Sequence, residues 1–352
     1  MMRRASRISA LSVAVLAAPA LAQPVPDYDF DWATIGDPGN RPANAQEAPF
    51  LHPPASDLVE IGDVDYEYRM TRTEVTVGQW FEFVDAYWPH NDERIDLSAF
   101  TSYWIRPQNP NPGPGEDPQY TLVHPDAASF PADMSWYYAA RYVNWLHNDK
   151  VNEKWAFETG VYDTSTFGGV DAQGNPTDQH TRNPDAKFWI PSMDEWAKGM
   201  YWDPDKHGPG EGGYWLRPDS GDEMLISAPP DMGGETNAGE YFVTLDPDER
   251  WQYFSVGQYP DVQSPWGLLD GSGGVSEWNE DRSPTPSSDE RIWQGSWFLL
   301  EFTYLKDRLD NIAPDRPTSS QHGLRLASAV PAPNTCALSL VCLAFTSSRR
   351  KR

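Results

Sequence analysis

Prolines and glycines interrupt this chain at short intervals along its whole length, with 33 prolines and 26 glycines among 352 residues. Proline fixes φ and removes a backbone donor, and glycine weakens regular elements, so both tend to end helices and strands. Aromatic residues make up 13% of the chain and hydrophobic residues 39%, which is enough for a folded core. The pattern therefore predicts a folded chain of short elements joined by many loops.

Polar caps followed by apolar residues at helical spacing predict three helices. Thr76 with Gln79, and Ser192 with Glu195, have the spacing of a capping box, and Ser135 begins the third segment. The apolar positions that follow lie on one helix face in each segment: Trp80, Phe83, Val84 and Tyr87; Trp136, Ala139, Ala140, Val143 and Leu146; Met193, Trp196, Ala197 and Met200.

Short segments rich in aromatic and β-branched residues predict strands at 65–70, 187–190, 253–257, 291–297 and 323–328. Two stretches between them, 106–119 and 203–238, are rich in proline, glycine and acids. We interpret both as long loops within one domain, because the flanking elements are too short to form separate cores. Residues 23–29 are predicted to be a flexible lead.

The first 22 residues have the pattern of a secretory signal peptide. Arg3, Arg4 and Arg7 precede an apolar stretch, and Ala20 to Ala22 form an A-x-A cleavage pattern. The apolar stretch is too short for a membrane-spanning helix. We therefore expect the chain to be exported, with residues 1–22 removed.

Residues 330–352 combine a proline-rich start, an apolar run from Thr335 to Phe345 and a basic end from Arg349 to Arg352. As a helix the apolar run covers roughly 16 Å, well short of the ~30 Å hydrocarbon core. This layout resembles a PEP-CTERM sorting signal, which an exosortase-type system recognises in the bacterial envelope. The resemblance implies a secreted or cell-envelope bacterial protein, with the export and sorting machinery as partners and transient membrane contact through the tail. A disordered basic tail is the alternative.

Charge and cysteine content narrow the function classes. The chain has 27 basic and 52 acidic residues, for a formal net charge of −25. Removing both terminal segments takes away seven basic residues and no acid, which gives −32. Such a surface repels nucleic acid, so no nucleic-acid partner is expected. The only cysteines are Cys336 and Cys342 in the tail, so residues 23–329 contain no thiol.

Six stretches resemble, in the same order, the formylglycine-generating enzyme (sulfatase-modifying factor) family. They read YRMTRTEVTVGQWFEF, MSWYYAARYVNWL, FWIPSMDEWAKG, WGLLDGSGGVSEWNED, IWQGSW and GLRLAS, and they span about 60 to 329. The resemblance implies the family's α+β fold over residues 30–329, which is related to C-type lectins and has short strands, few helices and long loops. WATIGDPGN and the tail are similar to the exported PEP-CTERM branch of the family.

The stretch GLLDGSGGVSEW, residues 267–278, corresponds to a calcium-binding loop of the family. The resemblance assigns the side chains of Asp270 and Glu277 and the main-chain carbonyls of Gly273 and Val275 as ligands. Calcium prefers about six to eight oxygens, often carboxylates mixed with carbonyls, and glycines let a backbone turn its carbonyls inward. We therefore expect calcium as the cofactor. The alternative is a glycine-rich turn with two solvated acids.

A second calcium site of the family would use the Asn237 side chain and the Ala238 carbonyl. Asp246 and Asp248 are candidate acids downstream, but their spacing matches the family poorly. An ordinary acidic loop is an equal alternative.

The family's oxidase holds copper and its substrate cysteine with two thiols, three and eight residues after a serine. Here that serine is Ser296, and the corresponding positions are Leu299 and Tyr304. Cu(I) favours thiolates, and residues 23–329 supply none. Copper and formylglycine formation are therefore not expected, and these three residues mark a groove at the former active site.

Two functions follow as hypotheses. The first is a calcium-stabilised, non-catalytic module of the cell envelope that holds a peptide or glycan in this groove. The second is an enzyme of the family, a non-haem metal oxidoreductase with a different active site. The seven histidines include no pair four residues apart, and the sequence shows no nucleophile–base arrangement, which favours the first.

Overall fold

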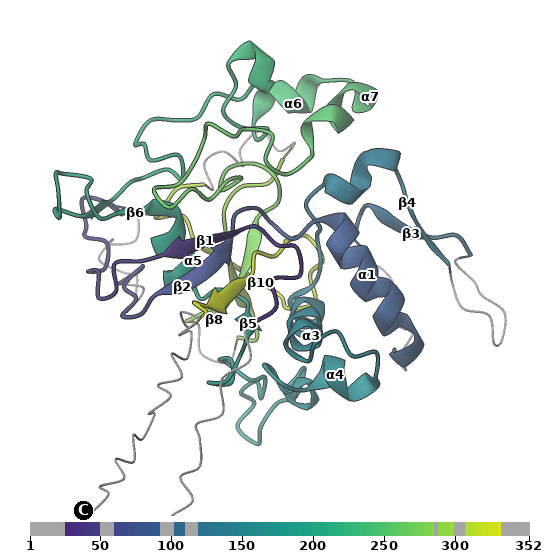
Figure 1. Cartoon of the computed structure of the whole chain (residues 1–352). Helices are drawn as coiled ribbons and strands as arrows, with labels where there is room; N and C mark the ends of the chain where they lie inside the picture. Colours follow the sequence, from purple (N-terminus) through teal and green to yellow (C-terminus); the bar gives the residue numbers. More distant parts are fainter. Residues whose placement is uncertain are drawn as a thin grey trace, which may run out of the picture. The chain divides into compact units, whose positions relative to one another are not determined.

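The computed structural model describes residues 25–49, 60–91, 102–109, 119–284, 288–298 and 307–331 (Figure 1). Residues 27–330 form one compact unit. The predicted signal peptide, the basic end of the tail, Leu299 and Tyr304 lie outside the described residues. Within the described ranges, no helix is both long and apolar enough to cross a bilayer.

The three predicted helices begin at their predicted caps. They are α1 (Val77–Tyr87), α3 (Trp136–His147) and α5 (Met193–Tyr201). Thr76 and Ser192 each form a complete capping box with the residue three positions on, and the Ser135 hydroxyl accepts a hydrogen bond from the amide of Tyr138. Each cap satisfies backbone N–H groups that a helix start leaves unpaired, so local sequence fixes these starts.

The other described helices are short. They are α4 (Lys154–Glu158), α6 (Glu240–Thr244), α7 (Pro247–Arg250), and the 3₁₀ turns η1 (Trp88–His90), η2 (Pro125–Ser129), η3 (Thr164–Thr166), η4 (Pro230–Met232) and η5 (Trp251–Tyr253). Their brevity agrees with the high proline and glycine content.

The described strands form small antiparallel sheets. One sheet has the order β1 (Trp32–Ile35), β2 (Tyr68–Thr71), β11 (Ala327–Ala329) and β5 (Phe188–Trp189). A second has the order β10 (Ala313–Asp315), β9 (Arg291–Gln294) and β8 (Glu277–Arg282). Two hairpins complete the set: β3 (Ile105–Pro107) with β4 (Tyr120–Leu122), and β6 (Trp202–Asp203) with β7 (Gly213–Tyr214). The predicted α+β class with short strands, few helices and long loops is confirmed.

Short strands confirm the predictions at 65–70, 187–190 and 291–297. The predictions at 253–257 and 323–328 need correction. Residues 253–257 form no strand: Tyr253 ends η5, and of the five residues only Phe254 is buried, where its ring packs against Phe298 with centroids 4.5 Å apart. In 323–328 regular pairing begins only at Ala327. The predicted flexible lead is also corrected at its end, because Asp27 pairs with Arg69 at 3.0 Å and the Tyr28 hydroxyl donates to the Leu146 carbonyl.

Tryptophan side chains attach the helices to strand β8. The indole N–H of Trp136 in α3 donates to the Asn279 carbonyl at 2.9 Å. The indole N–H of Trp196 in α5 donates to the Glu277 carboxylate at 2.7 Å. Both rings are fully buried, and a buried indole needs such a partner. These contacts fix the start of β8 and therefore the glycine-rich loop that precedes it.

Candidate cation pocket and aromatic groove

The glycine-rich loop before β8 wraps closely around two side chains from distant parts of the chain. Gly273 and Gly274 have φ of +85° and +58°, the left-handed region that favours glycine. A Cβ on Gly273 would overlap the Asn237 amide oxygen, and a Cβ on Gly274 would overlap the Glu74 carboxylate. Asn237 Oδ1 accepts from the Gly274 amide at 2.9 Å, and Glu74 Oε1 accepts from the Val275 amide at 3.2 Å. The glycines are thus required both for conformation and for close approach.

Glu277 is the anion of a buried ion pair. Its Oε1 lies 2.9 Å from Nη2 of Arg325, and its Oε2 accepts from Nε of Arg325 at 3.1 Å and from the Trp196 indole at 2.7 Å. Glu277 is 1% exposed and Arg325 fully buried. Both oxygens therefore already have strong donors, and Glu277 does not line the pocket that Asp270 lines.

Asp270 lies beside a carboxylate that the sequence did not single out, Glu74. Burial raises the pKa of Asp270 to about 6, while the Gly257 amide, which donates to its Oδ2 at 2.6 Å, and the Arg325 charge lower it. Burial also raises the pKa of Glu74 well above its ordinary value, and the charges of Asp270 and Glu277 raise it further. Both carboxyl groups line the same small pocket, and burial is the main cause of both raised pKa values.

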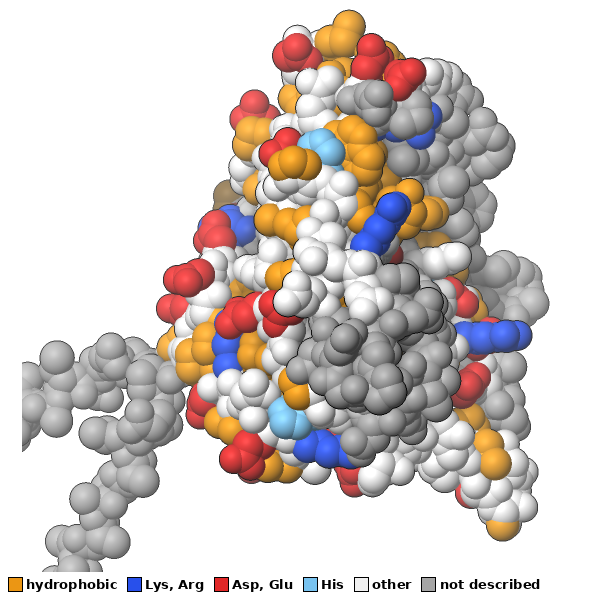
Figure 2. All heavy atoms as spheres, turned by 90° about the vertical axis from the view of Figure 1, so that its right-hand side faces the viewer, with side chains coloured by type: hydrophobic (Ala, Val, Ile, Leu, Met, Phe, Trp, Pro, Cys, Tyr) orange, Lys and Arg blue, Asp and Glu red, His pale blue; other side chains and the backbone are white. Residues whose placement is uncertain are grey.

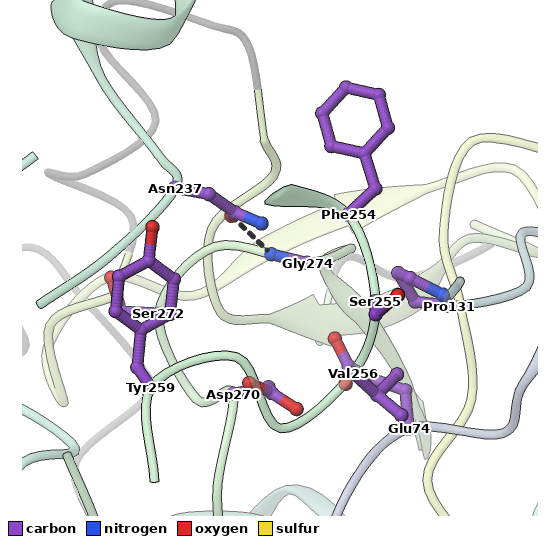
Figure 3. Close-up of a pocket in the computed structure, with 10 residues that line it drawn as sticks. All are labelled: Glu74, Pro131, Asn237, Phe254, Ser255, Val256, Tyr259, Asp270, Ser272 and Gly274. Atoms are coloured by element: carbon purple, nitrogen blue, oxygen red, sulfur yellow. Dashed lines mark hydrogen bonds between the residues drawn. The ribbon is translucent and has the colours of Figure 1, made fainter. Parts of the chain in front are cut away.

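These groups enclose a small polar pocket (Figure 3). Its cavity volume is about 10 Å³, room for about one water-sized particle. Glu74 and Asp270 line it together with the oxygen-bearing side chains of Asn237 and Ser272. In Figure 3, Asn237 reaches over Gly274 from one side, and Asp270 and Glu74 lie on the other.

The donor set determines which ion such a pocket suits. In the described ranges, no three His, Cys, Asp or Glu side chains are arranged as a metal site. The pocket instead is lined by two carboxyl side chains together with an amide and hydroxyl side chains. Hard cations such as calcium prefer all-oxygen ligand sets of this mixed kind. Of the four predicted ligands of the first site, Asp270 lines this pocket, whereas Gly273, Val275 and Glu277 are not among its lining residues.

The predicted second site does not form a separate cluster. Asn237 joins the pocket of Asp270, and its Nδ2 donates to the Tyr253 carbonyl at 2.8 Å. Ala238 is fully buried, and its amide donates to the Thr236 hydroxyl at 3.0 Å. Asp246 is exposed, and the side chain of Asp248 is outside the described set. The structure thus brings Asn237 to the first site.

A larger aromatic cavity of about 340 Å³ lies next to this loop, and we call it the aromatic groove. Its walls are formed mainly by aromatic side chains, with Asp133 and Arg250 as charged members: Tyr103, Trp104, Trp251, Phe254, Trp297 and Phe298. Figure 2 views the side of the molecule that carries α1, β3, β4 and α7, and shows hydrophobic side chains gathered in the upper half of that face. A volume of this order fits a small molecule or one or two residues of a polymer.

The rings of the groove differ in exposure. Trp104, Phe254 and Phe298 are 2%, 4% and 5% exposed and pack on one another, with Trp104 and Phe298 stacked at 6.0 Å. Tyr103 is 65% exposed. Asp133 accepts from the Ser102 hydroxyl at 2.5 Å and from the Tyr103 amide at 3.0 Å, and burial raises its pKa to about 6. The groove therefore has a fixed aromatic floor, accessible rims and one carboxyl group.

Ser296, the predicted marker of the former active site, is 1% exposed and points into the loop. Its hydroxyl accepts from the Gly273 amide at 2.7 Å. Trp297 and Phe298, the two residues that follow, line the groove. Ser296 itself does not line the groove, and Leu299 and Tyr304 lie outside the described residues.

A serine–histidine–aspartate chain that the sequence did not reveal lies on the other side of the loop. The Ser276 hydroxyl is 2.7 Å from Nδ1 of His322, whose Nε2 is 3.0 Å from the Asp315 carboxylate. Such a chain can activate a hydroxyl, but Ser276 is 3% and His322 5% exposed. The His322 ring is covered by Trp278 and Trp293, with centroids 4.4 and 4.7 Å away. A substrate cannot reach the hydroxyl, so we assign this chain a structural role.

The comparisons with known proteins agree with this geometry. The profile described as "Sulfatase-modifying factor enzyme 1-like domain" matches residues 58–330. Among curated protein sequences, none matches the chain. The profile covers most of the chain, so this is a sulfatase-modifying factor domain. The chain belongs to the formylglycine-generating enzyme family.

Three solved structures are similar to the chain. CarF has 15% identity and a TM-score of 0.45, and the match covers 86% of this chain and 99% of CarF. Variable protein 1 of Treponema denticola has 16% identity and a TM-score of 0.44, with 86% and 95% covered. PvdO from Pseudomonas aeruginosa has 15% identity and a TM-score of 0.44, with 88% and 100% covered.

Proposed function

We propose that this domain is a non-catalytic binding module of the bacterial cell envelope that holds a peptide or glycan in the aromatic groove. The observation that carries the proposal is the groove itself, an aromatic cavity of about 340 Å³ placed directly after Ser296 in a domain without thiols. Aromatic rings provide large, rigid contact area at low entropic cost, both to sugar faces and to apolar side chains. The Asp133 carboxyl adds a polar contact at the edge.

Binding by the groove can be tested with glycan and peptide arrays and the purified domain of residues 23–329. Wild type is expected to retain one class of probe, and Trp297→Ala or Trp251→Ala should lower that retention at least tenfold. Trp155→Ala is the matched control, because Trp155 is 51% exposed on α4 and does not line the groove. Equal retention by all variants, or retention by none of them including wild type, would contradict the proposed groove function.

The alternative function, an enzyme of the family with a different active site, predicts a redox-active metal. Wild type supplied with copper, oxygen and a sulfatase-type cysteine peptide should form no formylglycine, because residues 23–329 contain no thiol to hold copper or the substrate cysteine. Mass spectrometry of the peptide detects the aldehyde. Aldehyde formation, or stoichiometric iron or copper in the purified protein, would favour the enzyme.

We also propose export and sorting through the two ends of the chain. The support is the sequence pattern alone: the A-x-A site after the signal-like segment and the basic end Arg349 to Arg352. Replacing the four basic residues by serine in a host with the sorting system should change the mature mass or the envelope location. An unchanged mass and location would show that the tail is only a basic end.

Calcium stabilisation is the last part of the proposed function. Its support is the all-oxygen donor set around Asp270 and Asn237. Calcium that binds only the folded state would raise the melting temperature by mass action. A wild-type melting temperature that is the same in millimolar calcium and in chelator would rule this part out, while the groove test above would stand unaffected.

A further inference from the structure

Two tryptophan rings of the aromatic groove are fixed by packing and have no Lys or Arg side chain over them. Trp104 and Trp251 meet edge to face with ring centroids 5.1 Å apart, and the His124 ring stacks on Trp251 at 4.9 Å. Among the described residues, the Arg and Lys side chains that lie over aromatic rings use other rings than these two. Tryptophan attracts cations more strongly than tyrosine or phenylalanine does. The groove therefore offers preformed rings to a cationic ligand.

Asp133 is the only acid among the described residues that line the groove. Its Oδ1 accepts from the Ser102 hydroxyl and the Tyr103 amide, and its Oδ2 shares that same amide at 3.1 Å. Both donors are neutral, and no neighbouring cation is among the groups that shift the pKa of Asp133. A carboxylate among apolar rings is stabilised by a cation that pairs with it. Oδ2 can accept a further hydrogen bond, so an ammonium group of a ligand fits beside it.

The rest of the lining favours an apolar ligand body over a sugar. Seven of the nine described lining residues are aromatic or aliphatic, and none is Asn, Gln, Ser or Thr. Each sugar residue carries several hydroxyl groups, and hydroxyl groups that are buried without partners are costly. Arg250 is the other charged lining residue, and its guanidinium repels a second positive charge. The lining therefore suits a ligand with an apolar body and a single ammonium group.

The charge of the whole domain acts in the same direction. Residues 23–329 carry a formal net charge of −32, which raises the local concentration of cations and lowers that of anions. Salt screens such an attraction over about 8 Å at physiological ionic strength. Association of a cationic ligand should therefore weaken as salt is added, whereas association of a neutral ligand should not.

We infer that the aromatic groove binds an organic ammonium ligand, a single ammonium group on an apolar body, such as a peptide lysine beside an apolar residue. Asp133 pairs with the ammonium group, and the tryptophan rings hold both its charge and the apolar body. The cavity of about 340 Å³ has room for one such ligand. This inference rests on the proposed binding function of the groove and narrows its ligand from a peptide or glycan to an amine.

Calorimetric titration of the purified protein with matched probes tests the ligand class. The probes are the capped dipeptide Phe-Lys, the same dipeptide with its lysine acetylated, 2-phenylethylammonium and the neutral sugar chitotriose. At pH 8, above the pKa of about 6 of Asp133, wild type should bind the lysine dipeptide at least tenfold more tightly than the acetylated one and chitotriose. Added salt should reduce only the binding of the charged probes. The ratio between the dipeptide and 2-phenylethylammonium then separates a peptide source from a small free amine.

Variants test which groups recognise the ammonium group. Asp133→Asn keeps the shape of the side chain and should weaken binding of the lysine dipeptide at least tenfold, with the acetylated dipeptide changed less than twofold. Trp251→Phe should weaken binding of the lysine dipeptide severalfold. Asp231→Asn is the matched control, because Asp231 is exposed on η4 and does not line the groove, and it changes the net charge equally. Melting curves check that each variant is folded.

Three outcomes would overturn the inference. Equal affinity of wild type for the lysine dipeptide and its acetylated form would show that the groove does not recognise charge. Unchanged affinity of Asp133→Asn for the lysine dipeptide would place the ammonium group elsewhere. Failure of wild type to bind either charged probe would exclude an amine. In each case retention of another probe class on the arrays would leave the proposed binding function intact, and retention of none would remove both.

Discussion

The ion pair of Glu277 and Arg325 permits a quantitative test of how the loop before β8 is held. Both side chains are at most 1% exposed, and they are linked by contacts of 2.9 to 3.2 Å. Removing one partner of a buried pair leaves an uncompensated charge and costs about 3–5 kcal/mol. For a domain of about 300 residues, with an unfolding entropy near 0.6 kcal/mol/K, this lowers the melting temperature by about 5–8 °C.

Arg325→Met and Glu277→Gln should therefore each destabilise the domain by about 3–5 kcal/mol, while the double variant loses much less than the sum. In the double variant neither member of this pair is left without the other. The main remaining losses are the Arg325 charge near Glu74 and Asp270 and the hydrogen bonds that Arg325 donates to the carbonyls of Thr71 and Leu269, about 1 kcal/mol each. The coupling energy should thus exceed about 3 kcal/mol.

Urea unfolding of the four proteins, in calcium and again in chelator, measures this coupling. The exposed pair Arg72 and Asp31 is the control, since these side chains are 36% and 79% exposed and a cycle there should give less than about 1 kcal/mol. If the two single changes at Glu277 and Arg325 add within about 0.5 kcal/mol, the pair does not hold the loop and the reasoning is wrong.

Three further predictions concern other parts of the domain. Gly274→Ala should destabilise the domain by more than about 2 kcal/mol in urea unfolding, because a left-handed φ and the Glu74 carboxylate both exclude a Cβ; a loss as small as that of Gly39→Ala, which has open space, would contradict this. Burial raises the pKa of Asp194 from 3.8 to about 7, so the folded state keeps a proton that the unfolded chain releases, and the stability present below about pH 4 is lost as pH rises toward 7. Asp194→Asn should flatten that fall in a pH series of melting curves, and an unchanged slope would refute the assignment. Ser192→Ala should cost about 1 kcal/mol, measured by urea unfolding, through loss of the cap of α5, whereas Ser192→Thr should cost little.

Local chemistry made the helix starts and the loop predictable. A capping box satisfies backbone donors within four residues, so Thr76 and Ser192 set the starts of α1 and α5 without help from the rest of the fold. The glycines around Asp270 likewise indicate a backbone that only glycine can adopt, and Gly273 and Gly274 do have positive φ. The absence of thiols from residues 23–329 is a property of composition that no tertiary structure could alter.

Only the tertiary structure decided which side chains meet at the loop. Glu74 hydrogen-bonds to a residue 201 positions away, and Glu277 pairs with an arginine 48 positions away. The sequence did not single out Glu74 and gave no sign of the Arg325 partner of Glu277, since spacing along the chain carries no information about partners that long loops bring together. The same holds for residues 253–257, whose pattern is strand-like although only Phe254 is buried and lines the aromatic groove. Burial depends on the whole packed environment, so the position of Glu74, and not Glu277, beside Asp270 in the small polar pocket was visible only in the folded structure.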